Sequence, residues 1–141
     1  MDKKTKGTAS ELSVASKLVR LGFTVSWPLN QDAYDLVAEK EGKLSRGQVK
    51  TASLNKGGSY RCSAQHGATP HRNYTKADCD FLVIHAPYSR DFDDISKDSY
   101  YVIPVSEVED TKIIFVFPAG KGRGKLLTCS WEKYNGGWEK I

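Results

Sequence analysis

Four polar residues are of types that together can hydrolyse a phosphate ester: Glu11, Asp35, Gln48 and Lys50. Hard divalent cations bind carboxylate, amide and carbonyl oxygens, which makes Asp35, Glu11 and the Gln48 side chain candidate ligands. The backbone carbonyl of Val49, between Gln48 and Lys50, is a fourth candidate ligand. A lysine beside such a site can orient or deprotonate a water molecule and stabilise charge on a phosphate. The set is therefore typical of metal-assisted phosphodiester hydrolysis.

The grouping depends on a predicted hairpin whose strands are residues 34–40 and 44–52. A two-residue Glu-Gly turn between them would place Asp35 opposite Gln48. Alternate side chains on a strand share a face, and so do directly opposed residues, so Asp35, Gln48 and Lys50 would meet on one face. A turn shifted by one residue keeps the three together, whereas a turn of odd length sends Asp35 to the other face.

Each candidate also has a simpler interpretation. Thr8 and Glu11 have the spacing of a capping box, in which the glutamate only satisfies the start of a helix. Asp35 and Lys50 could form an exposed cross-strand ion pair, which contributes less than about 1 kcal/mol. The order of the elements, a helix and then two strands, and the basic residues that follow favour the catalytic interpretation.

The elements that must position these residues combine helix and strand patterns. A helix is predicted at residues 8–21, because apolar residues recur there every three to four positions. The apolar run at residues 81–86 predicts a buried strand. We expect an α/β or α+β fold, with one mixed central sheet flanked by helices, in a single domain over residues 1–141 with a loose basic tail at residues 1–5. The other predicted elements are strands at residues 23–27, 59–65, 99–103 and 113–117, a loop at 66–77, a short helix at 104–108 and a helix at 131–138.

Composition excludes several classes of protein. The chain has 141 residues and is 39% apolar, which is enough for a core and too much for a disordered chain. No apolar run reaches the length of a membrane span, and the first residues lack the apolar stretch of a signal peptide. Cys62, Cys79 and Cys129 are far apart and predict reduced thiols rather than a zinc site. We therefore expect a cytoplasmic protein without a membrane partner.

The net charge of +4 hides an asymmetry along the chain. Residues 1–76 carry +7 and residues 77–141 carry −3, and no acidic residue occurs in residues 42–76. We call residues 42–76 the basic window. Such a stretch is expected on a surface that faces phosphates, although it could also be an ordinary solvated face. Arg61 could also read a guanine edge in a major groove. The candidate phosphate contacts are Lys6, Lys56, Tyr60, Arg61, His66, Arg72, Lys76, Lys121 and Arg123.

Four segments resemble the PD-(D/E)xK nuclease superfamily: residues 6–11, 21–25, 34–37 and 47–51. In order, they match a helix glutamate, a Gly-Phe-x-Val strand, a strand aspartate and an acid-x-lysine strand. The chain is most similar to the small endonucleases associated with group I introns, in which the last element is Gln-x-Lys. Residues 101–106, Tyr-Val-Ile-Pro-Val-Ser, are similar to a strand-to-helix segment of that group. Archaeal Holliday junction resolvases share the outline more distantly.

The resemblance implies a role for each matched residue and a restriction-endonuclease-like fold. Asp35 corresponds to the metal-binding aspartate, Lys50 to the catalytic lysine and Glu11 to the helix glutamate. Gln48 stands where an acid is usual, and because a neutral amide binds Mg²⁺ more weakly, Glu11 would supply the second negative charge. The resemblance also implies Mg²⁺, for which Mn²⁺ would substitute, and double-stranded DNA as the substrate of a homodimer or homotetramer.

Three functions follow from these observations. The first is a sequence-specific, homing-type endonuclease that cuts duplex DNA at the nucleoid. The second is a Holliday junction resolvase, which reads the shape of branched DNA rather than its sequence. The third is a DNA-binding module without catalysis, in which Gln48 marks a decayed site.

Overall fold

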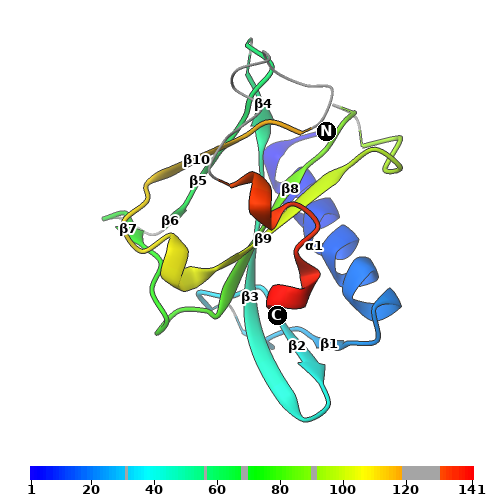
Figure 1. The fold of residues 1–141 in the computed structure, drawn as a ribbon, viewed down its shortest axis with the longest axis vertical. Coiled ribbons are helices and arrows are strands. Elements are labelled where there is room, and N and C mark those ends of the chain that lie inside the picture. The colour runs from blue at the N-terminus through cyan, green and yellow to red at the C-terminus, as the bar shows by residue number, and fades with distance from the viewer. Residues whose placement is uncertain (31, 56, 68–69, 90–91, 119–130) are drawn as a thin grey trace.

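The computed structural model describes the chain apart from residues 31, 56, 68–69, 90–91 and 119–130. Its centre is a five-stranded sheet in the order β1 (Thr24–Ser26), β2 (Leu36–Lys40), β3 (Lys43–Thr51), β8 (Phe81–Ala86) and β9 (Ser99–Pro104) (Figure 1). β3 and β8 run parallel, whereas the other neighbours are antiparallel. The expected mixed central sheet is therefore confirmed.

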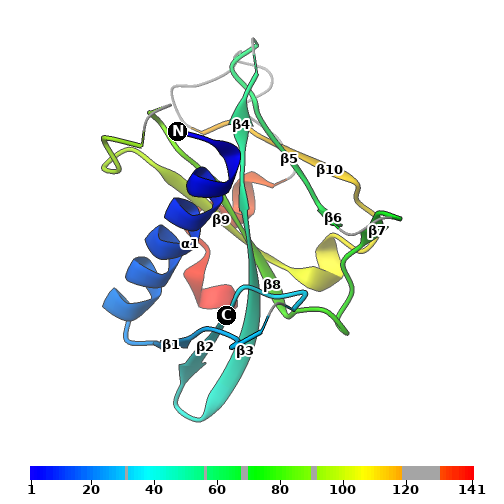
Figure 2. The same ribbon diagram turned by 180° about the vertical axis from the view of Figure 1, so that it is seen from behind.

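The two faces of the sheet are covered by different structures. Among the described residues one α-helix, α1 (Lys3–Arg20), covers the first face, where Val14 and Leu18 pack against Val83 of β8 (Figure 2). Leu82 of β8 points to the second face and packs with Ile114 of a smaller sheet. The smaller sheet contains β4 (Ser53–Leu54), β5 (Tyr60–Ser63) and β10 (Ile113–Val116), and a separate ribbon contains β6 (Gln65–His66) and β7 (Arg72–Asn73).

α1 begins earlier than the apolar pattern predicts. Asp2 caps the helix by accepting a hydrogen bond from the Thr5 N–H at 2.8 Å, so the predicted loose tail at residues 1–5 is wrong. Thr8 lies inside the helix, where its hydroxyl donates to a backbone carbonyl one turn earlier at 3.2 Å. The capping-box interpretation of Glu11 is therefore wrong as well. The apolar pattern does not predict the first turn of α1, because that turn contains only polar residues and has no apolar periodicity.

The hairpin between β2 and β3 has the predicted two-residue turn. Lys40 pairs with Lys43, and the turn residues Glu41 and Gly42 both have positive φ, 53° and 80°. This is the type I′ geometry that matches the twist of a hairpin. This two-residue turn therefore sets the register of the hairpin, and the register places Asp35 beside the middle of β3.

The C-terminal segment differs from the helix predicted at residues 131–138. It forms two short 3₁₀ turns, η3 (Glu132–Tyr134) and η4 (Trp138–Lys140). Gly136 between them has a φ of +67°, at which a right-handed helix cannot continue. Tyr134 is buried, and the ring of Trp138 lies 5.7 Å from that of Tyr100, so the segment packs on the core. The short helix predicted after Pro104 is the 3₁₀ turn η1 (Val105–Glu107).

Two of the three cysteines lie in the part of the chain that the structure describes. Cys62 and Cys79 are buried free thiols, and Cys129 lies outside the described residues. Burial raises the pKa of each described thiol to about 12, which makes them unreactive. Across the described ranges, no helix has the length and apolar character needed to cross a membrane.

Candidate active site

The candidate residues meet where β2 separates from β3. β2 pairs with β3 as far as Leu36 and Gly47, and β3 then continues to Thr51 while paired with β8. Asp35, the residue before β2, occupies the edge that β2 leaves open. Its N–H donates to the Gly47 carbonyl at 2.8 Å, and its carboxylate accepts from the Val49 N–H at 2.9 Å. Asp35 is therefore fixed to β3 by both its backbone and its side chain.

Gln48 and Lys50 point to the face of β3 opposite α1, as the alternation along the strand requires. The Lys50 ammonium donates to the Gln65 carbonyl at 3.1 Å and lies 5.1 Å from the centre of the Tyr74 ring. Burial lowers the pKa of Lys50, while the Asp35 carboxylate opposes this change. Lys50 is therefore held in one place and gives up its proton more readily than an exposed lysine.

Glu11 approaches the same site from α1. Burial raises the pKa of Glu11 to about 7, and the negative charge of Asp35 contributes to this rise. Burial also raises the pKa of Asp35, whereas the Val49 N–H and the Lys50 charge oppose it. Two carboxyl groups whose charged forms are destabilised by burial, one of them also by the charge of the other, are a typical sign of a functional cation site.

The oxygen atoms at this edge fit a hard divalent cation. The N–H and C=O of one strand residue point to the same edge, so the Val49 carbonyl faces the side on which Asp35 lies. The Gln48 amide nitrogen donates to that carbonyl at 3.4 Å, which keeps the amide beside it. Mg²⁺ is usually held by one or two carboxylates, with water and substrate completing its shell. No three His, Cys, Asp or Glu side chains cluster within the described residues, so Glu11 and Asp35 would act with neutral oxygens.

Comparisons with known proteins identify the family. The model of the PD-(D/E)XK endonuclease family matches residues 1–122 of the chain. The chain belongs to the PD-(D/E)XK endonuclease family. Its structure is similar to that of a bacterial homing endonuclease, I-Ssp6803I, with a TM-score of 0.81 and 24% identity, over 99% of this chain and 92% of that chain. Protein 5.3 of Escherichia phage T7 is 52% identical over 48 residues, which are 33% of this chain and 41% of that protein.

These findings bear on two of the sequence-based expectations. The resemblance of residues 6–11, 21–25, 34–37 and 47–51 to PD-(D/E)xK nucleases is confirmed by the family match. The expected fold is confirmed by the structural similarity over nearly the whole chain. The match to the phage protein spans less than half of that protein's length.

Two of the basic residues predicted to contact DNA are paired with acids in this PD-(D/E)XK chain. Arg72 donates two hydrogen bonds, of 2.6 and 2.7 Å, to the Asp78 carboxylate and holds its pKa at about 2. The Lys76 ammonium lies 2.7 Å from the Asp80 carboxylate. Both acids directly follow the basic window, so the fold offsets part of the positive charge of the window. The Arg72 and Lys76 side chains stay 53% and 73% exposed, so phosphate contacts at these positions stay a prediction.

The other predicted DNA contacts differ in exposure. Tyr60 is 1% exposed, because Tyr60 and Cys62 of β5 face the core while Arg61 faces solvent. Tyr60 is therefore wrong as a surface contact. Lys6 and His66 are half-buried. Lys56, Lys121 and Arg123 lie outside the described residues.

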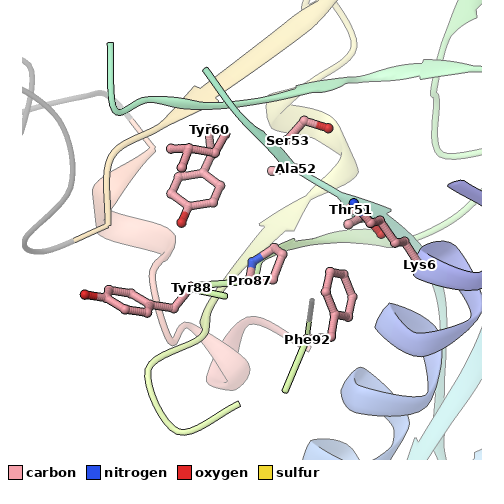
Figure 3. Close-up of a pocket in the computed structure, with 9 residues that line it drawn as sticks. Lys6, Thr51, Ala52, Ser53, Tyr60, Pro87, Tyr88 and Phe92 are labelled. Carbon is pink, nitrogen blue, oxygen red and sulfur yellow. The ribbon is translucent and has the colours of Figure 1, made fainter. Parts of the chain in front are cut away.

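A cavity of about 250 Å³ opens at the C-terminal end of β3. Lys6 of α1, Thr51 and Phe92 line it, together with the ring of Tyr60 (Figure 3). The candidate carboxylates do not line this cavity. Its walls come from segments far apart in the chain, and nothing in the sequence marks Thr51 beyond its place directly after Lys50.

Proposed function

We propose that this protein is an Mg²⁺-dependent endonuclease that hydrolyses phosphodiester bonds in double-stranded DNA. The observation that carries the proposal is the Asp35 carboxylate, which the Val49 N–H fixes at the open edge of β3 within electrostatic reach of the Glu11 carboxylate and the Lys50 ammonium. Carboxylates alone would repel a phosphate, whereas carboxylates that hold a cation beside a lysine would stabilise the charge of the reacting phosphate. Membership of an endonuclease family supports the same conclusion.

Each residue has a distinct role in the proposed reaction. Glu11 and Asp35 would hold the cation, together with the Val49 carbonyl and the Gln48 amide oxygen. When bound, Mg²⁺ supplies positive charge that polarises the scissile phosphate and makes water nucleophilic at neutral pH. Lys50 orients the attacking water and stabilises the charge that develops on the phosphate. Asp35 keeps its orientation because the Val49 N–H holds one of its carboxylate oxygens.

We further propose a sequence-specific, homing-type enzyme. I-Ssp6803I, described as a bacterial homing endonuclease, supports this type through its TM-score of 0.81 over 99% of the chain. The Gln-x-Lys element at Gln48 and Lys50 supports it as well. One candidate site lies in the described part of each chain and duplex cleavage needs two, so we propose a homodimer or homotetramer that works at the nucleoid.

Cleavage assays test this proposal. The protein is incubated with Mg²⁺ and a plasmid library of random sequence, with linear duplex and with a four-way junction, and the ends produced are sequenced. We expect double-strand cuts at one recurrent sequence, no preference for the junction, cleavage with Mn²⁺ as well, and none in EDTA. Preferential cutting of the junction would make the protein a resolvase. DNA binding without cleavage would make it a binding module.

Matched variants test the assigned residues. Asp35→Asn and Lys50→Met should each lower the cleavage rate by roughly 10²–10³-fold, because each removes a charge that the transition state needs. Glu39→Gln on β2 and Lys43→Met on β3 remove the same charges at exposed positions of the same hairpin and should leave the rate unchanged. Full activity in Asp35→Asn and Lys50→Met would rule out this site.

A further inference from the structure

A buried chain of polar side chains joins α1 to the sheet next to the proposed site. The Ser10 hydroxyl lies 2.6 Å from the Thr51 hydroxyl and 2.8 Å from Nδ1 of His85. The other ring nitrogen of His85, Nε2, lies 2.8 Å from the Asp98 carboxylate. Ser10 and His85 are 0% exposed, and the side chain of Asp98 is 1% exposed. None of these four residues has a role in the reaction proposed above.

Serine, histidine and aspartate in this order resemble a nucleophilic triad, yet they cannot act as one. A triad serine has to reach the reacting atom of its substrate. Ser10 has no exposed surface and lies between α1 and the sheet, so a substrate cannot reach its hydroxyl. The network can therefore act only by fixing the position of α1 relative to the sheet, the two elements that it connects.

The hydrogen bonds of the network run in one direction. The Asp98 carboxylate only accepts, so Nε2 of His85 donates to it. Burial lowers the pKa of His85, although the bond to Asp98 opposes this, and a neutral ring can accept from the Ser10 hydroxyl at Nδ1. The Ser10 oxygen then accepts from the Thr51 hydroxyl. Each hydrogen bond determines which group donates in the next one, and this fixes the geometry of the whole network.

The His85 ring itself has little freedom. Tyr100 stacks on it with ring centres 4.8 Å apart and an interplanar angle of 7°. Phe92, which lines the cavity in Figure 3, packs edge-on at 5.5 Å. Asp98 is held in turn by the Tyr88 N–H at 2.9 Å. The network is therefore anchored at the end that lies in the sheet and its loop.

The other end of the network adjoins the proposed catalytic residues. Ser10 precedes Glu11 on α1, and Thr51 follows Lys50 on β3. Apolar packing of α1 on the sheet is not directional, so by itself it tolerates small shifts along the helix axis. Hydrogen bonds have defined lengths and angles and therefore do not tolerate such shifts. A shift of about 1 Å between reacting groups can cost roughly 100-fold in rate.

We propose that Ser10, His85 and Asp98 are positioning residues for phosphodiester cleavage. Through the hydroxyl bond to β3 they hold Glu11 in register with Lys50. Groups that do not touch the substrate commonly orient the groups that do. The catalytic part of this inference rests on the proposed function, whereas its effect on cation binding can be measured without DNA.

Two variants break the same hydrogen bond from its two sides. Ser10→Ala and Thr51→Val remove one hydroxyl each with little change in shape. Each should lower the single-turnover cleavage rate roughly 10- to 100-fold while the Kd for DNA in EDTA stays unchanged. The double variant should be no slower than Ser10→Ala alone, because Thr51→Val removes only a bond that Ser10→Ala has already removed. Ser13→Ala, which removes a hydroxyl bonded to Tyr100 one turn along α1, is the control and should cleave at the wild-type rate.

Calorimetric titration of the protein with Mn²⁺ gives a readout that does not depend on cleavage. Ser10→Ala should weaken Mn²⁺ binding in the same sense as Glu11→Gln, with an unchanged circular dichroism spectrum. If Ser10→Ala does not fold, Thr51→Val decides, because Thr51 is only half-buried. Folded variants that cleave DNA and bind Mn²⁺ like the wild type overturn the proposal. If the wild type binds Mn²⁺ but does not cleave DNA, only the proposed function is wrong. The Mn²⁺ affinities of the variants then test the positioning role. A wild type that does neither overturns both.

Discussion

Glu11 is the residue that most clearly departs from what stability alone would favour. An exposed glutamate on a surface helix would keep an ordinary pKa, yet α1 holds Glu11 half-buried beside the Asp35 carboxylate. Burial and this second charge raise the pKa of Glu11 to about 7. Such an arrangement costs stability unless a cation lies between the two groups, and functional sites often carry a cost of this kind.

Cation binding should therefore depend on pH near neutrality. Below its pKa of about 7, Glu11 is protonated and neutral, and above it the side chain is an anion that can ligate. The affinity of the free protein for Mn²⁺ should rise between about pH 6 and about pH 8, because ligand protons compete with the metal. Titration calorimetry at several pH values measures this rise. Glu11→Gln should bind more weakly with a flatter profile, and a flat profile in the wild type would contradict the role of Glu11.

At the scale of elements, the site arises because β3 is longer than its neighbour. β2 ends at Leu36, so the peptide groups of β3 beyond Gly47 face an edge that Asp35 fills rather than another strand. Gly47 lies at the point of separation, directly over the ring of Phe81. The core thus packs immediately beneath the start of the site, which holds the backbone of β3 in place.

Gly47→Ala should destabilise the protein by about 1–3 kcal/mol, the usual cost of overpacking a core. An added Cβ would lie 2.5 Å from Cζ of Phe81, a residue that is 2% exposed and packed in the core. Thermal unfolding followed by circular dichroism measures the effect. Gly7→Ala in α1 is the matched control: its Cβ meets nothing within 4 Å, so it should stabilise the helix by roughly 0.5–1 kcal/mol. A Gly47→Ala protein as stable as the wild type would contradict this packing.

At the scale of the whole molecule, the distribution of charge matters more than the net charge of +4. The basic window is typical of a surface that faces phosphates, but Asp78 and Asp80 form ion pairs with Arg72 and Lys76. These pairs order the segment between the smaller sheet and β8. The described part of the window that remains exposed without an acidic partner includes Arg61, on the outer face of β5.

The quaternary structure should match the need to cut two strands. We expect light scattering of the full chain, with and without duplex DNA, to give the mass of a homodimer or homotetramer of the 15.7 kDa chain. The reason is geometric, because one proposed site per chain attacks one strand at a time. A protein that stays monomeric in both conditions and still makes double-strand cuts in one encounter would contradict this prediction.

The sequence by itself determined the part of the site that lies on one hairpin. A two-residue turn sets the register of its strands, and side chains alternate with a period of two, so Asp35, Gln48 and Lys50 could be grouped without a structure. The buried strand at residues 81–86 was equally predictable, because every residue in it is buried and the pattern is continuous. In both cases the physical rule acts between residues that are neighbours in the chain.

Only the tertiary structure decided the contacts between distant segments. It placed Glu11 beside Asp35, closed the ion pairs of the basic window, and joined Ser10 to His85 across 75 positions of the chain. It also turned Tyr60 inward, because the smaller sheet packs its inner face on the central one. Such contacts follow from the simultaneous packing of all the elements, and no local pattern of residues records them.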